Sequence, residues 1–159
     1  MILVDTNILV AVANSRDNQH EMARDLLEGI PDRLLVPPTV IAEVCYLPSE
    51  RAGAAAEVGF LRSFEAGDLE LAELTLPDVR RMAELSEQYA RLGLGGTDAS
   101  IVAIAERLAI AQIATMDRRH FGVVRPRHVD AFALLPALTG EDGLLVTWWL
   151  SSWLSALLP

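Results

Sequence analysis

The chain has 159 residues, of which 52% are hydrophobic, and its formal net charge at pH 7 is −9. This length and composition predict a globular domain with a sizeable core and argue against an intrinsically disordered protein. Because the sequence contains no lysine, a P-loop and a Schiff-base enzyme are excluded. The only cysteine, Cys45, cannot form an internal disulfide. It therefore predicts a reducing, cytoplasmic environment and a buried structural thiol rather than a nucleophile.

Short apolar runs alternate with helical patterns along the chain. In chain order, the expected elements are a strand at 1–5, a helix from about Asn7, a helix at 17–29, a strand at 33–36, a helix that opens at Pro37 and Pro38, a helix at 50–66, a strand at 69–74, a helix at 77–91, a helix at 99–109 and a strand at 112–116. This alternation predicts an α/β fold with a central parallel β-sheet flanked by α-helices on both faces.

A hydrophobic, Trp-rich extension at 137–159 follows the predicted domain at 1–136. Residues 144–159 carry no charge and include Trp148, Trp149 and Trp153. A membrane-spanning helix needs about 20 apolar residues, so this stretch is short for one. Polar residues recur in it every four positions, which favours an amphipathic helix that packs on the domain or on a partner. Contact with a membrane is the less favoured alternative.

Four acidic residues occupy positions that suggest chemistry. Asp5 and Asp117 each follow a predicted strand, Asp98 lies at the start of a predicted helix, and Glu43 lies on an apolar helical face. Ligands of open α/β sheets bind beside the carboxyl ends of the strands. Each acid also has a purely structural explanation, since Asp98 could cap a helix, Asp117 could form a turn and Glu43 could pair with an arginine. Such explanations become improbable for all four together.

If these carboxylates converge, their mutual repulsion calls for a cation among them. Oxygen ligands of this kind select Mg²⁺, with Mn²⁺ as a possible substitute, rather than zinc. A carboxylate-held metal suits phosphodiester hydrolysis, because it activates water and stabilises charge on the phosphate. Thr6, Asn7 and Thr115 are expected to orient the metal-bound water or the Asp5 carboxylate by hydrogen bonds.

Although the net charge is negative, four basic residues are clustered in one part of the sequence. Arg118, Arg119, Arg125 and Arg127 lie within ten positions of one another. They could face the phosphates of a nucleic acid. The alternative is an ordinary solvated run of charge, and the sequence leaves the two open.

Four motifs, in order, resemble those of PIN-domain ribonucleases, and most closely the VapC toxins of type II toxin–antitoxin pairs. The motifs are MILVDTN at 1–7, VIAE at 40–43, GTDASI at 96–101 and IATMDRRHF at 113–121. The resemblance spans residues 1 to about 136. It implies a PIN-like fold and a Mg²⁺-dependent endoribonuclease, with Asp5, Glu43, Asp98 and Asp117 as catalytic metal ligands and Thr6 as their hydroxyl partner.

The same resemblance implies partners. A VapC-type toxin cleaves RNA, is silenced by a VapB-like antitoxin encoded beside it, and is usually a homodimer. Related proteins often stop near Pro136, where this chain continues into the extension. Two other readings stay open: a catalytically silent PIN-like binding protein, and another metal-dependent phosphohydrolase. A haloacid-dehalogenase-type enzyme is disfavoured, because it needs an aspartate where the chain has Asn7 and also needs a lysine.

Overall fold

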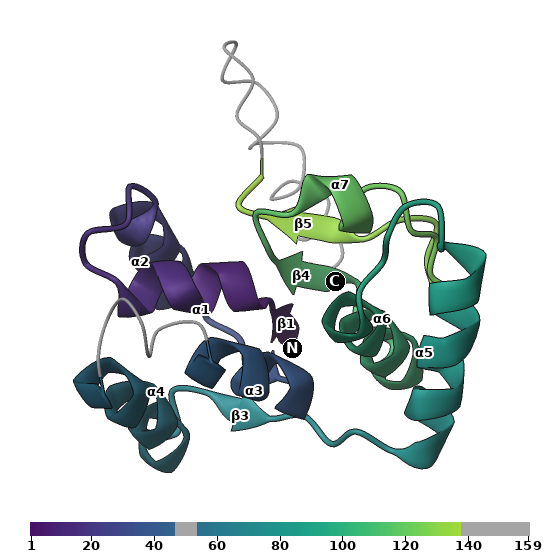
Figure 1. Ribbon diagram of the computed structural model, residues 1–159. Coiled ribbons are helices and arrows are strands. Elements are labelled where there is room, and N and C mark those ends of the chain that lie inside the picture. Colours follow the sequence, from purple (N-terminus) through teal and green to yellow (C-terminus); the bar gives the residue numbers. More distant parts are fainter. Residues whose placement is uncertain (47–53, 138–159) are drawn as a thin grey trace, which may run out of the picture.

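The computed structural model describes residues 1–46 and 54–137 (Figure 1). The first residues of the helix expected at 50–66 and nearly all of the extension expected at 137–159 lie outside this part of the chain. Among the described residues, no helix is both long and apolar enough to cross a membrane.

The described strands form one five-stranded sheet in the order β3-β2-β1-β4-β5, and every neighbouring pair is parallel. The strands are β1 (Ile2–Val4), β2 (Leu34–Val36), β3 (Glu70–Leu71), β4 (Gln112–Ala114) and β5 (Ala133–Leu135). Since β2 lies on one side of β1 and β4 on the other, the strand order reverses between β1 and β4. In sheets of this topology ligands bind just outside the carboxyl ends of strands such as β1 and β4, and we call that region the crevice.

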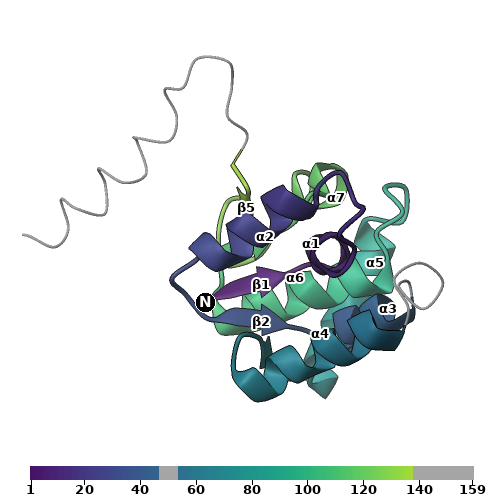
Figure 2. The same ribbon diagram turned by 90° about the vertical axis from the view of Figure 1, so that its left-hand side faces the viewer.

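Helices cover both faces of the sheet. They are α1 (Thr6–Ala13), α2 (His20–Gly29), α3 (Pro38–Tyr46), α4 (Ala54–Ala66), α5 (Leu76–Gln88), α6 (Gly96–Leu108) and α7 (Arg118–Phe121). Figure 1 shows α1 and α2 on one side of the strands and α5 and α6 on the other. In the view turned by 90°, α6 lies behind β1 while α1 and α2 face the reader (Figure 2). The α/β architecture with a central parallel sheet is thereby confirmed.

Strand β1 and helix α6 lie at the centre of a core to which most of the other elements also contribute. Leu3 and Val4 are fully buried, as short parallel strands covered on both faces must be. Every residue of α6 from Ala99 to Ala105 is buried, because this helix packs between the sheet and α5. Two ion pairs join α5 to α6: Arg81 binds Glu106, with Nε 2.7 Å from Oε2, and Arg107 binds Asp78, with Nε 3.0 Å from Oδ2.

Several element boundaries differ from the sequence prediction. Helix α2 begins at His20 rather than at 17, because the Asp17 carboxylate accepts a hydrogen bond of 2.8 Å from the backbone N–H of Gln19 and forms a turn there. Helix α6 begins three residues before Ala99. The strand expected at 69–74 pairs only over β3. Helix α7 and strand β5 were not predicted.

Cys45 is half-buried rather than fully buried. Its partial burial, reinforced by the nearby negative charge of Glu57, raises the pKa of the thiol. A raised pKa lowers the thiolate fraction at neutral pH, which agrees with the expectation that this cysteine is not a nucleophile.

Candidate functional site

Asp5 lies at the junction of β1 and α1. Its backbone N–H continues the sheet by donating to the carbonyl of Ala114 at 3.0 Å. Its side chain, in a residue only 4% exposed, caps α1 by accepting from the backbone N–H of Thr6 at 2.7 Å. The other carboxylate oxygen accepts from Asn7 Nδ2 at 2.7 Å and from Thr115 Oγ1 at 2.6 Å. Three donors therefore hold this carboxylate at the carboxyl end of β1.

The pKa of Asp5 is shifted by its burial and by the charges and hydrogen bonds around it. Burial, with smaller contributions from the negative charges of Asp98 and Asp117, raises this pKa from 3.8 to about 6, against the lowering effect of the hydrogen bonds from Thr115 and Thr6. Carboxylates that raise one another's pKa lie close together, so the structure brings these three acids into one crevice. A divalent cation placed there would relieve both the repulsion and the cost of burial.

Asp98 lies in the first turn of α6, which Gly95 caps. Burial is the main cause of its raised pKa. The charge of His120 opposes this rise, whereas those of Asp117 and Glu43 add to it. Asp98 is therefore not the cap of its helix, and it faces the other acids from the side of the sheet opposite α1.

Asp117 follows β4 and caps α7, where its Oδ1 accepts from the backbone N–H of His120 at 3.0 Å. Its own N–H donates to Thr115 Oγ1 at 2.9 Å. The His120 ring lies between two acids, with Nδ1 2.8 Å from Asp117 Oδ2 and 3.0 Å from Asp98 Oδ2. Within the described part of the chain, these three residues are the group whose ligand atoms lie close enough, within 4.8 Å, to hold a metal ion.

Glu43 approaches the crevice from α3. Its Oε2 accepts a hydrogen bond of 2.7 Å from the hydroxyl of Thr6. Thr6 thus links two acids, because its N–H holds Asp5 while its hydroxyl holds Glu43. The structure therefore places all four predicted acids, and the three predicted hydrogen-bonding residues, around one crevice.

His120 was not among the predicted site residues. Its spacing of three residues from Asp117 becomes a signal only if a turn of helix is known to follow Asp117. The sequence could not reveal that a turn of helix begins at this point, because α7 has only four residues.

The four predicted RNA-binding arginines have different surroundings. Arg118 is half-buried and binds the carbonyl of Pro136. Arg125 donates to the carbonyls of 122–124, and Arg127 forms an ion pair of 2.8 Å with Glu84. Arg119 is exposed, and its one described contact is 3.5 Å long, to the carbonyl of Leu92. Of the four, Arg119 is therefore the least engaged by the described protein.

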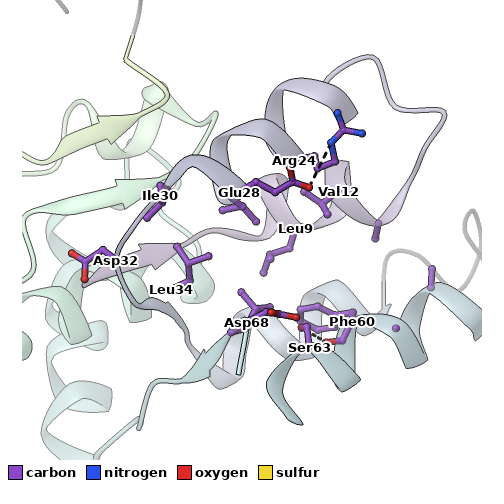
Figure 3. Close-up of a pocket in the computed structure, with 15 residues that line it drawn as sticks. Leu9, Val12, Arg24, Glu28, Ile30, Asp32, Leu34, Phe60, Ser63 and Asp68 are labelled. Atoms are coloured by element: carbon purple, nitrogen blue, oxygen red, sulfur yellow. Dashed lines mark hydrogen bonds and ion pairs between the residues drawn. The ribbon is translucent and has the colours of Figure 1, made fainter. Parts of the chain in front are cut away.

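A cavity of about 660 Å³ lies apart from the acids, between α1, α2, β2 and α4 (Figure 3). Leu9 and Val12 line it from α1, Leu27 from α2 and Phe60 from α4. The charged residues that line it are Arg24, Glu28, Asp32 and Asp68. Residues at the start of α1 thus hold the acidic crevice, while later residues of the same helix line this apolar cavity.

Comparison with known proteins assigns the family. Residues 2–125 match the model of the PIN domain. The chain is 32% identical over 135 residues to ribonuclease VapC26 of Mycobacterium tuberculosis, a match that covers 85% of this chain and all of the relative. The chain is a PIN-domain protein of the VapC ribonuclease family.

Solved structures of similar fold agree with this assignment. This PIN domain superposes on M. tuberculosis VapC20, a toxin described as cleaving the sarcin–ricin loop, with a TM-score of 0.73 and 20% identity over 81% of this chain and 98% of that one. The structure of VapBC2 from Rickettsia felis, bound to a promoter DNA fragment, matches with a TM-score of 0.60 and 21% identity. The match covers 84% of this chain and 98% of that one. FitAcB of Neisseria gonorrhoeae matches with a TM-score of 0.53 and 19% identity, over 74% of this chain and 88% of that one. At these identities the likeness concerns the fold.

Proposed function

We propose that this PIN domain is a Mg²⁺-dependent endoribonuclease and the toxin of a toxin–antitoxin pair. The observation that carries the proposal is the convergence of Asp5, Glu43, Asp98 and Asp117 where the strand order reverses. The resemblance to a ribonuclease over the whole length of that relative supports RNA as the substrate. The description of VapC20 as a toxin supports the biological role.

The residues fit a divalent cation. Asp98 and Asp117 would hold it with carboxylate oxygens, and Asp5 stands beside them with a charge that burial disfavours. Mg²⁺ and Mn²⁺ favour such oxygen donors. When bound, the ion lowers the pKa of water and neutralises charge that develops on a phosphodiester.

The chain's own residues have positioning roles in this reaction. Asn7 and Thr115 fix the Asp5 carboxylate from one side, and the N–H of Thr6 fixes it from the other. The Thr6 hydroxyl holds Glu43, so the acid of α3 keeps its orientation toward the crevice. Hydrolysis by water leaves a 5′-phosphate and a 3′-hydroxyl, whereas attack by the RNA's own 2′-hydroxyl would leave a cyclic phosphate.

For the partner, we propose a VapB-like antitoxin that inserts an apolar segment into the cavity between α1, α2 and α4. The cavity has apolar walls, and its three carboxylates outnumber the positive charges of Arg24 and of the N-terminal ammonium group that pairs with Asp32, which favours a segment with positive charge. The VapBC2 complex is a neighbour in fold, which supports a partner of this class. We also propose a homodimer, since Leu71, Leu76 and Val79 are exposed apolar residues of β3 and α5.

Cleavage of purified total RNA tests the nuclease. We expect discrete fragments with Mg²⁺, none with EDTA, and a loss of at least about 100-fold in rate for Asp98→Asn. The matched control is Asp130→Asn, at an exposed position in the loop before β5, and it should cleave like the wild type. Fragments that form in EDTA, or that end in cyclic phosphates, would contradict the mechanism.

A further inference from the structure

The ring of His120 occupies an unusual position among the acids. Its Nδ1 atom is buried and makes no directed hydrogen bond within the described protein, although Asp98 and Asp117 each place an oxygen within 3.0 Å of it. A buried ring nitrogen without a hydrogen bond needs an explanation, because desolvating a polar atom without replacing its partner costs free energy.

The distances match those between neighbouring ligands of one ion. In an octahedral site with bonds of about 2.1 Å, adjacent ligand atoms lie about 3 Å apart. Nδ1 is 2.8 Å from Asp117 Oδ2 and 3.0 Å from Asp98 Oδ2. An ion that binds both carboxylate oxygens can therefore be reached by Nδ1 without a large movement of the ring.

The position of the ring is set by its helix. The backbone N–H of His120 donates a hydrogen bond to the Asp117 carboxylate, so the backbone of the histidine is held by one of the acids. Phe121, the next residue, is 1% exposed and anchors α7 in the core. The ring is thus presented to the crevice from an anchored turn, as a metal ligand should be.

We infer that His120 is a nitrogen ligand of the ion held by Asp98 and Asp117, binding through Nδ1 with its proton on Nε2. This inference rests on the proposed metal-dependent function and adds a residue to it. An imidazole in an otherwise oxygen-based site strengthens binding of Mn²⁺ relative to Mg²⁺, because nitrogen donors suit transition metals better than Mg²⁺.

Pulsed electron paramagnetic resonance of the Mn²⁺-loaded full chain tests the assignment directly. We expect nitrogen modulation from a coordinated imidazole, and a change in its pattern when the protein contains ¹⁵N-histidine. The modulation should disappear in His120→Gln and persist in His20→Gln. His20 is a suitable control because its Nδ1 lies 2.9 Å from the carbonyl of Ala11 in another part of the fold.

Metal affinity gives the second measurement. His120→Gln should weaken Mn²⁺ binding about 10-fold or more and Mg²⁺ binding less, while its circular dichroism stays that of the wild type. Bound Mn²⁺ without nitrogen modulation, or modulation that survives in His120→Gln, would overturn the inference. If RNA cleavage still required metal in that case, the proposed function would stand. Failure of the wild type to bind Mn²⁺ at all would overturn both.

Discussion

The hydroxyl of Thr115 donates to the Asp5 carboxylate at 2.6 Å and joins the end of β4 to the end of β1. The same oxygen accepts from the N–H of Asp117 at 2.9 Å. One buried hydroxyl thus orients two acids of the crevice, on both sides of the point where the strand order reverses.

Replacing this hydroxyl should therefore affect both folding and catalysis. For Thr115→Val, which keeps the shape of the side chain, we expect the free energy of unfolding to fall by about 1–3 kcal/mol, since the Asp117 N–H and the Asp5 oxygen each lose a partner. RNA cleavage should fall at least about 10-fold. Thr115→Ser keeps the hydroxyl and should retain most of both. Urea unfolding and cleavage rates measure the two effects, and equal behaviour of the two variants would contradict this role.

The link between Thr6 and Glu43 predicts a more selective loss. Thr6→Val removes the 2.7 Å hydrogen bond to Glu43 but leaves the backbone N–H that holds Asp5. We expect kcat for RNA cleavage to fall about 10-fold, and Thr6→Ser to restore it. If Thr6→Val cleaved at the wild-type rate, orientation of Glu43 by this hydroxyl would not matter for the reaction.

The raised pKa of Asp5 predicts how stability depends on pH without metal. Its folded-state pKa of about 6 exceeds the ordinary 3.8, so the protonated form favours folding, and this contribution is lost as the pH rises through 6. The raised pKa of Asp98 acts in the same direction.

Between pH 5 and pH 8 in EDTA, the Asp5 contribution alone should lower the free energy of unfolding by about 1.4 kcal/mol. Saturating Mn²⁺ should reverse the trend, because the metal binds the ionised carboxylates. Urea unfolding at several pH values measures this. The metal-free Asp5→Asn variant should show a flatter pH profile, and a profile parallel to that of the wild type would contradict the assignment.

The apolar cavity predicts a variant that separates partner binding from catalysis. Gly59 lines the cavity from α4, and a Cβ atom added there meets no other atom within 4 Å. Gly59→Glu should therefore fold, place a carboxylate at the cavity and weaken the complex with a co-expressed VapB-like antitoxin, while free protein cleaves RNA normally. Val58→Glu is the control, since Val58 is 47% exposed and does not line the cavity. Equal antitoxin binding by both variants would place the partner elsewhere.

The arginines predict different contributions to RNA binding. Arg119→Gln should lower RNA affinity and reduce the slope of its salt dependence by about one unit. Arg127→Gln should change affinity little, because Glu84 already neutralises this guanidinium. Fluorescence anisotropy with a catalytically inactive Asp98→Asn protein measures both. A larger loss for Arg127→Gln would reverse the ranking.

Much of this architecture could be predicted from local pattern. Apolar runs that end in a carboxylate predicted β1 and β4, and the first turn of α6 could be placed to within three residues of its start. The strand β5 could not be predicted, because its three residues are recognisable only beside β4, with which they pair. The same holds for α7, whose single turn depends on the Asp117 cap.

The candidate site shows the same limit. The ends of the predicted strands indicate which acids lie at the edge of the sheet, so the convergence of Asp5 and Asp117 could be predicted from topology. The hydrogen-bond partner of each hydroxyl could not be predicted from topology, since Thr6 binds Glu43, which lies 37 positions away in the sequence. His120 could not be recognised as part of the crevice without knowing that its ring lies between two carboxylates.

Helix α1 carries the acidic crevice at its first turn and the apolar cavity on its later turns, yet the two share no residue. Cavity residues that are only partly buried, such as Val12 and Ala13, can therefore change over evolutionary time without altering the groups that do the chemistry. Related toxins in one genome could diverge in which partner they accept and remain equally potent. With the antitoxin bound at the cavity as proposed, pairing specificity and reactivity would be separately inheritable traits of a single helix.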